Sequence, residues 1–384
     1  MTTPPSAAGH RVHGMGTALE APTWPAVTPD EAAAILAGFP AAGRMTALEW
    51  HSPRPFSAAT LVRTTTGAFV VKRHHHRLRS PAGLAEEHAF IAHLAARGVS
   101  VADVLRTASG ESAVTADGWT YEVHRQAPGA DLYRDRQSWT PFLSGAHAGA
   151  AGAALARLHD AAAGFDAPAR TVQPLVTSLA ILSAADPIVA VEAYVAARPA
   201  LAGYLATRPW RRELAALFAS LGQGLAPRLA VQPPLWTHND WHPSNLLWAT
   251  DGSVAATFDF GLADRTSAVH DIATAIERTA VRWLDLGQGA DDSIADPDAA
   301  VALLDGYATV RPLSSADLAT IAALLPLVHV EFALSEIDYF AGIAGDPDAA
   351  TLAWDGYLLA HAEWFRAGAG RALLRAITQM ESQR

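Results

Sequence analysis

The sequence contains no cysteine among its 384 residues, which excludes disulfides, thiolate metal sites and cysteine nucleophiles. It also lacks a long hydrophobic run. The most apolar stretch, residues 318–330, falls short of the roughly 20 residues that a membrane-spanning helix needs. The N-terminus has no charged region followed by an apolar core, so a secretory signal is not expected. We therefore expect a cytoplasmic protein with no membrane partner.

Lysine and asparagine are almost missing as well. Lys72 is the only lysine among 28 lysines and arginines, and Asn239 and Asn245 are the only asparagines. The two asparagines fall in one short segment of the chain. A composition that has otherwise dispensed with these residue types keeps them where the chemistry is specific, so all three positions are candidate functional residues.

Basic charge is scarce in most of the chain, and the formal net charge is −10. Residues 1–126 are nearly balanced, with 11 basic and 10 acidic residues, whereas residues 127–384 hold 17 and 28. Nucleic acid is not an expected partner, because its binding needs a basic face. The acidic part favours a cationic small molecule through its electric field. An acidic surface kept for solubility explains the same charge equally well.

Apolar periodicity gives a coarse secondary structure. Strand patterns occupy residues 45–49, 58–63, 68–71, 101–105, 112–116 and 119–124. Helical patterns, with their capping and stop signals, occupy residues 30–37, 81–97, 146–159, 174–185, 187–198, 210–225, 270–284, 299–307, 315–340 and 347–367. The strands precede almost all of the helices, which predicts an α+β fold with a small antiparallel sheet.

One later segment reads as loop, strand, tight turn and strand. The turn is Asp251-Gly252, a strong hairpin signal, so residues whose numbers sum to about 503 should pair. Asn245 then lies opposite Phe258, one step from Asp259, and Asp240 lies in the loop just before. Side-chain oxygens meeting at the open end of a hairpin suit a Mg²⁺ ion that carries a nucleotide phosphate.

These residues carry a family resemblance. His238-Asn239-Asp240, then Asn245, then Asp259-Phe260-Gly261 resembles the catalytic loop and metal motif of protein-kinase-like small-molecule phosphotransferases. That family includes aminoglycoside phosphotransferases, choline kinases and homoserine kinases. The resemblance implies that Asp240 accepts the proton of a substrate hydroxyl, and that Asn245 and Asp259 hold Mg²⁺. The implied reaction transfers the γ-phosphoryl group of ATP to a small molecule, such as an aminoglycoside or other antibiotic, an amino alcohol or a sugar.

The resemblance also implies a two-lobe architecture. Residues 1–28, rich in proline, glycine and alanine, are expected to form a loose arm. Residues 29–126 would form the N-lobe, which binds the nucleotide. Residues 127–384 would form a mainly helical C-lobe with the catalytic loop and the substrate pocket. Pro128-Gly129 marks the redirection of the chain between the lobes.

Lys72 ends an apolar strand, and the resemblance implies that it binds the α- and β-phosphates and pairs with a helix glutamate. Helix geometry selects that glutamate. Glu87 lies three residues after Leu84 and four before Ile91, on the inward face, whereas Glu86 is rotated by about 100°. A buried carboxylate needs a cation, so we expect a Lys72–Glu87 pair; the alternative is a partly buried Glu87 with an arginine neighbour.

Three further residues are assigned to the nucleotide site, and one acid is assigned to its support. Ser57 lies in the loop that would cover the phosphates, although this loop lacks the glycine-rich pattern of protein kinases. Gln126 and Ala127 lie in the segment that resembles the hinge against which the base binds. Asp271 matches a family aspartate that braces the catalytic loop.

Two other functions remain open at this point. A bacterial serine/threonine protein kinase would need an activation segment, and the short connection after Asp259-Phe260-Gly261 leaves little room for one. A nucleotide-binding protein without catalysis would not need the complete set, which consists of Lys72, Asp240, Asn245 and Asp259. A histidine-asparagine-aspartate loop does not by itself separate a metabolic kinase from one that modifies antibiotics.

Overall fold

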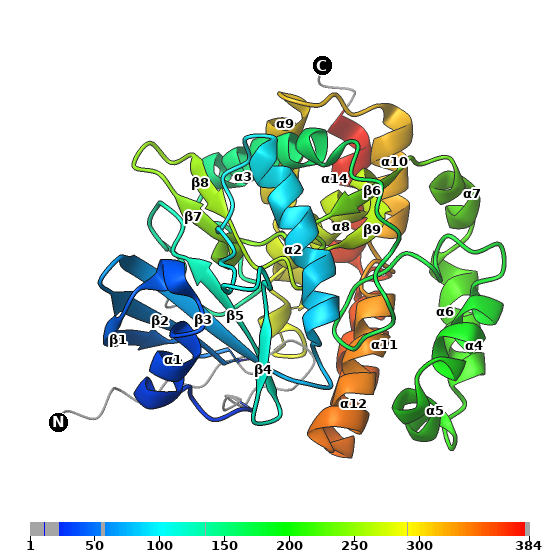
Figure 1. Ribbon diagram of the computed structural model, residues 1–384. Coiled ribbons are helices and arrows are strands. Elements are labelled where there is room, and N and C mark those ends of the chain that lie inside the picture. The colour runs from blue at the N-terminus through cyan, green and yellow to red at the C-terminus, as the bar shows by residue number, and fades with distance from the viewer. Residues whose placement is uncertain (1–10, 12–22, 55–57, 135, 290, 381–384) are drawn as a thin grey trace.

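The computed structural model describes residue 11 and residues 23–54, 58–134, 136–289 and 291–380. Ser57 and most of the expected N-terminal arm lie outside these ranges. Figure 1 shows a small sheet from the first third of the chain beside a larger, mainly helical part. The α+β, two-lobe arrangement predicted from the sequence is confirmed.

The N-terminal sheet is antiparallel, with strand order β1-β2-β3-β5-β4. Its strands are β1 (Met45–His51), β2 (Ala58–Thr64), β3 (Gly67–His75), β4 (Val114–Ala116) and β5 (Trp119–Arg125). The predicted strand at 101–105 is wrong. Thr257 bonds to Ser100 at one end of this segment, whereas Leu105 bonds to Val123 at the other. Because its ends bond to different parts of the molecule, the segment makes only isolated bridges within the described ranges.

Two helices accompany this sheet. Helix α1 (Pro29–Leu36) begins with a capping box between Thr28 and Glu31. Helix α2 (Pro81–Ala96) begins after Ser80, whose side chain accepts a hydrogen bond from Gly83. The sheet has its own apolar core, but Phe90, Ile91 and Leu94 of α2 belong to the core of the helical part. Helix α2 therefore connects the two parts of the molecule (Figure 1).

The larger part contains two short antiparallel strand pairs, β6 (Pro234–Thr237) with β9 (Asp264–Ser267) and β7 (Leu246–Trp248) with β8 (Val254–Thr257). Its α-helices are α3 (Gly145–Ala162), α4 (Pro187–Ala196), α5 (Pro199–Leu205), α6 (Trp210–Leu221), α7 (Leu225–Ala230), α8 (Ala268–Thr279), α9 (Pro297–Ala308), α10 (Ser315–Leu324), α11 (Val330–Tyr339), α12 (Pro347–Leu352), α13 (His361–Trp364) and α14 (Gly368–Gln379). The predicted long helix at 315–340 is broken into α10 and α11.

The helix predicted at 174–185 is wrong. Buried Glu331 on α11 accepts hydrogen bonds from the backbone N–H groups of Ala180 and Ile181, at 3.1 and 2.8 Å. The hydroxyl of Ser178 donates to the same carboxylate. A buried carboxylate needs hydrogen-bond donors, and Glu331 takes them from this segment. The segment is therefore irregular, although its apolar periodicity is helical.

Within the described residues, no single helix is long and apolar enough to cross a membrane. The adjoining helices α4 and α5 pass the test of length and composition only as a pair, and they are bent by 115° at their break.

Glycine sets the separation of α3 and α9. A Cβ atom at Gly306 would lie 1.9 Å from the carbonyl oxygen of Gly149, and one at Gly152 would lie 1.9 Å from that of Leu303. We expect Gly306→Ala to lower the free energy of unfolding by about 1–3 kcal/mol or more, because two helix backbones must separate. Urea unfolding measures the change. Gly203→Ala in α5 is the matched control, since its Cβ would meet nothing within 4 Å. Equal stability of the two variants would contradict this packing.

Candidate active site

The hairpin β7–β8 has the predicted register at its open end, and the register shifts between Leu247 and Trp248, nearer the turn. Leu246 pairs with Thr257, and Leu247 pairs with Ala256. The backbone N–H of Phe258 donates to the carbonyl of Asn245 at 3.1 Å. Asn245 therefore lies one residue from Asp259 across the hairpin, at its open end.

Asp271 holds the loop that precedes this hairpin. Its carboxylate is fully buried and accepts hydrogen bonds from the backbone N–H groups of His238 and Asn239, at 2.9 and 2.8 Å. His159 Nε2 lies 3.0 Å from the same carboxylate. The predicted bracing role of Asp271 is confirmed in its contacts. The helix itself is capped by the Ser267 side chain.

Asn239 explains one of the two rare asparagines. Its φ is +58°, a left-handed conformation in which asparagine is enriched among non-glycine residues. Its buried side-chain oxygen accepts hydrogen bonds from Thr237 and Thr266, and its amide donates to the carbonyl of Leu262. The residue fixes a turn of the loop and joins it to the strand pair β6–β9.

Asp240 lies between an arginine and an amide. Arg278 Nη1 lies 2.5 Å from Asp240 Oδ1, and Asn245 Nδ2 donates to Asp240 Oδ2 at 3.0 Å. Burial alone would raise the pKa of Asp240, but Arg278 and His242 outweigh it and hold that pKa well below its usual range. Asp240 is therefore ionised, which is the form that can accept a proton.

Lys72 pairs with acids other than the predicted one. Its Nζ lies 2.9 Å from Asp259 Oδ1 and 3.9 Å from Glu122 Oε1. Glu87 is buried on the inward face of α2 as predicted, but its ion pair is with Arg170, at 3.6 Å. The expected Lys72–Glu87 ion pair does not form among the described residues. The physical reason is register: Glu122 lies directly across from Lys72 in the β3–β5 pairing.

Electrostatics still connect these groups. Burial opposes the charge of Lys72, but Asp259, Glu122 and Glu87, in that order, raise its pKa. Burial would raise the pKa of Asp259, and Lys72 nevertheless keeps it below the usual value. Both partners are therefore charged at neutral pH, one from the sheet and one from the hairpin.

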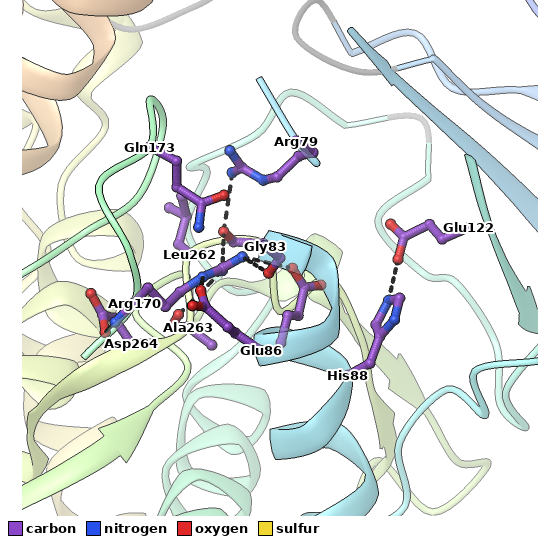
Figure 2. A network of polar contacts seen from close by, with 12 residues as sticks. Arg79, Gly83, Glu86, His88, Glu122, Arg170, Gln173, Leu262, Ala263 and Asp264 are labelled. Carbon is purple, nitrogen blue, oxygen red and sulfur yellow. Dashed lines mark hydrogen bonds and ion pairs between the residues drawn. The ribbon is translucent and has the colours of Figure 1, made fainter. Parts of the chain in front are cut away.

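Two buried arginines hold the segment after Asp259. Arg79 Nη2 and Arg170 Nη1 donate to the carbonyl of Gly261, at 3.2 and 3.1 Å. Arg170 also donates from its side chain to Gly83 on α2 and from its backbone to Asp264. Figure 2 shows both arginines, with Asp264, gathered at the first turn of α2. The network therefore links α2 to residues 259–261.

An apolar slot lies between the sheet and the hairpin. It is lined by Ala59, Leu61 and Val70 from the sheet and by Leu247 and Phe258 from the hairpin. Such a slot suits a planar base.

The predicted hinge residues Gln126 and Ala127 also line this slot. The backbone N–H of Gln126 already donates to Ala68 at 3.0 Å, so that donor is taken. The remaining hinge groups stay a prediction.

A second cavity adjoins the slot on the side of α8 and α11. The two cavities share Lys72, Asp259 and Arg54. The lining of the second also includes Trp139, Asp240, Arg278, Phe332 and Glu336. A molecule in this second cavity would reach Asp240.

Sequence reasoning missed three charged residues here. Arg54 reaches toward the hairpin, with its Nη1 and Nη2 atoms each 3.4 Å from oxygens of Asn245 and Ser244. It belongs to the loop that was expected to cover the phosphates. Arg278 follows Asp271 by seven residues, a spacing that places both on one helix face. Glu122 could be recognised only from the register of β3 and β5, which places it opposite Lys72.

The donor set fits a magnesium ion. Asn245 and Asp259 supply amide and carboxylate oxygens at one end of the hairpin, and Mg²⁺ prefers oxygen ligands. The Asn245 amide group is oriented by its donation to Asp240, which turns its oxygen toward the cleft where Arg54 lies.

Comparison with known proteins agrees with this geometry. Residues 54–313 match the phosphotransferase enzyme family. A homoserine kinase of Caulobacter sp. (strain K31) is 28% identical over 315 residues, covering 81% of this chain and 86% of that protein.

Solved structures show the same fold. An aminoglycoside phosphotransferase from Alicyclobacillus acidocaldarius has a TM-score of 0.54 at 17% identity, over 94% of this chain and 98% of the other. A microcompartment-associated aminopropanol kinase has a TM-score of 0.52 at 18% identity, over 92% and 100%.

The ion pairs separate the effects of Lys72 and Glu87. The resemblance implies that Lys72 binds the phosphates of ATP. We therefore expect Lys72→Ala to raise the KM for ATP by about tenfold or more, because the phosphates lose a charged hydrogen-bond partner. Glu87→Gln should mainly lower the melting temperature, because Arg170 loses its buried anionic partner. Steady-state kinetics and thermal unfolding of both variants measure this split. A Glu87→Gln variant with unchanged stability and the kinetics of Lys72→Ala would restore the pairing expected from the sequence.

Proposed function

Since the chain belongs to the phosphotransferase enzyme family, we propose that it uses ATP and Mg²⁺ to phosphorylate a hydroxyl group of a small molecule. One observation supports this most directly. Asp240, Asn245 and Asp259 converge at the mouth of one hairpin, and Lys72 faces Asp259 from the sheet. These are the side chains that phosphoryl transfer needs around a nucleotide and a hydroxyl.

We propose that the nucleotide lies in the apolar slot between the sheet and the hairpin. The adenine would occupy the apolar slot beside Gln126 and Ala127. Its phosphates would then reach Lys72 and Arg54, which line both cavities. Ser57 belongs to the same loop as Arg54 and is proposed to contribute there. Glu87 would contribute indirectly, because its negative charge raises the pKa of Lys72.

Asn245 and Asp259 would hold Mg²⁺. When bound, the ion neutralises negative charge on the phosphates. Lys72, which is paired with Asp259 before nucleotide binds, would then turn to the phosphate oxygens. The protein does no covalent chemistry in this scheme. It contributes position and fixed charge.

Asp240 would accept the proton of the acceptor hydroxyl. Its Oδ2 is fixed by the Asn245 amide, and its Oδ1 faces Arg278. An acceptor in the second cavity must separate Arg278 from Oδ1 to bring its hydroxyl there. An acceptor that offers Arg278 another anion would compensate this lost ion pair.

This geometry favours an acceptor with an acidic group. The Arg278 side chain is almost fully buried and lies over the ring of Trp139, 4.3 Å from its centroid. A guanidinium recognises a carboxylate through paired hydrogen bonds. The cationic acceptor favoured by the acidic composition would instead meet a buried arginine beside Asp240.

Glu336 adds a second contact in the same cavity. Burial raises its pKa to about 8, and its Oε2 has no hydrogen-bond partner among the described residues. An ammonium group would supply that partner and ionise the carboxyl. An acceptor with both groups, a hydroxy amino acid, satisfies Arg278 and Glu336 together. The relatives named homoserine kinase support this choice.

ADP formation tests the acceptor class. We expect homoserine to be phosphorylated with a kcat/KM about 10–100-fold above that of a matched amino alcohol without the carboxylate, because one charged hydrogen-bond partner is lost. Aminoglycosides should be poorer still. Preference for the amino alcohol would contradict the role of Arg278 but not the kinase activity. If neither homoserine, nor the amino alcohol, nor an aminoglycoside leads to ADP formation, the proposed kinase activity itself is contradicted.

The proton acceptor has its own test. Asp240→Asn keeps the shape of the side chain but removes its basicity, so kcat should fall by about 10²–10⁴-fold while the affinity for ATP stays nearly unchanged. Asp251→Asn, in the exposed turn of the hairpin, is the control. Turnover of Asp240→Asn near that of the wild type would exclude Asp240 as the base.

A further inference from the structure

A cluster of histidines surrounds Glu122 at the wall of the two cavities, where His124 lines the apolar slot and His74 and Glu122 line the second cavity. Glu122 and His124 are two apart on β5 and therefore point to the same face of the sheet. His74 on β3 projects from that face as well, and His88 comes from α2, which packs against it. The side chains of His88, Glu122 and His124 are more than nine-tenths buried.

The ring nitrogens converge on one carboxylate. His88 Nε2 and His124 Nε2 lie 2.6 and 2.8 Å from the same oxygen, Glu122 Oε2. The ligand atoms of these three residues all lie within 4.8 Å of one another. Figure 2 shows the contact between His88 and Glu122, with His88 projecting from the helix toward the strand.

We propose that His88, Glu122 and His124 bind a zinc ion. Four ligands about 2.0–2.1 Å from Zn²⁺ stand about 3.3 Å apart, so the two nitrogen–oxygen separations of 2.6 and 2.8 Å need to widen by about 0.7 and 0.5 Å. Two imidazoles and one carboxylate are a known zinc donor set that leaves a fourth position for water. Nitrogen ligands disfavour Mg²⁺, so the nucleotide's ion is not expected to compete.

One outer contact favours metal binding over a plain hydrogen-bond network. Ser112 Oγ lies 2.8 Å from His88 Nδ1. If this hydroxyl accepts a hydrogen bond from Nδ1–H, the neutral His88 ring carries no proton on Nε2. The lone pair of Nε2, on the side of Glu122 Oε2, is then available to bind a metal ion. Outer-shell partners of this kind orient metal-binding histidines.

The other carboxylate oxygen is already engaged. His74 Nε2 lies 3.0 Å from Glu122 Oε1, and Lys72 Nζ lies 3.9 Å from that same oxygen. The proposed ion therefore takes Oε2, while Oε1 stays with His74 and Lys72. The site is distinct from the Mg²⁺ ligands, yet it shares the carboxylate that faces Lys72. An ion there would draw negative charge away from Lys72.

The test uses chelator-treated, nucleotide-free protein titrated with Zn²⁺ against a chromogenic competing chelator. We expect one Zn²⁺ per chain. Co²⁺ at the same site should give the visible absorption of a four-coordinate ion with nitrogen and oxygen ligands. His124→Gln should weaken Zn²⁺ binding by more than the roughly 10–100-fold that loss of an outer-shell partner costs, and Ser112→Ala should weaken it within that range.

His76→Gln is the matched control, because His76 is an exposed histidine just beyond the end of β3. It should bind Zn²⁺ as the wild type does. Thermal unfolding checks that each variant is folded, and Ser112→Ala with the Co²⁺ spectrum decides the matter if His124→Gln does not fold. Wild-type protein without one-to-one binding would overturn the proposal. So would binding that is unchanged in Ser112→Ala and lost in His76→Gln. Neither result would affect the assignment as a kinase, which ADP formation tests separately.

Discussion

The arrangement of the active site depends on one buried carboxylate. Asp271 accepts hydrogen bonds from two successive backbone N–H groups of the catalytic loop and from His159. An ionised group without these partners would be costly to bury, so the contacts are mutually required. They hold Asn239 in its left-handed conformation. From that turn the chain delivers Asp240 to the cleft and, five residues later, Asn245 to the hairpin.

The acidic side chains of the cleft form ion pairs with basic ones. Asp259 is paired with Lys72 across the two lobes, and Asp240 is paired with Arg278 from α8. Buried ions need such partners, and each pair joins a carboxylate with a proposed role in the reaction to a cation proposed to bind a substrate. Phosphates that bind Lys72 would free Asp259 for the metal. An anionic acceptor that binds Arg278 would free Asp240 for the hydroxyl. The proposed substrates thus exchange one set of ion pairs for another.

Local patterns predicted local structure, and long-range register decided the rest. The Asp-Gly turn predicted the pairing at the open end of the hairpin correctly, although the register shifts by one residue next to the turn, where Trp248 pairs with Val254. Helical spacing placed Glu87 inward correctly. Its partner was wrong because the β3–β5 register puts Glu122, not Glu87, across from Lys72. The false helix at 174–185 failed for a similar reason, since its backbone bonds to Glu331 from a distant helix.

The central claim is that the hairpin mouth holds the nucleotide's metal. A crystal structure with Mg²⁺ and a non-hydrolysable ATP analogue tests it most directly. We expect one ion at about 2.0–2.1 Å from oxygens of both Asn245 and Asp259, with Lys72 turned from Asp259 to the phosphates. An ion bound by neither side chain, with the Lys72–Asp259 pair intact beside the nucleotide, would contradict it.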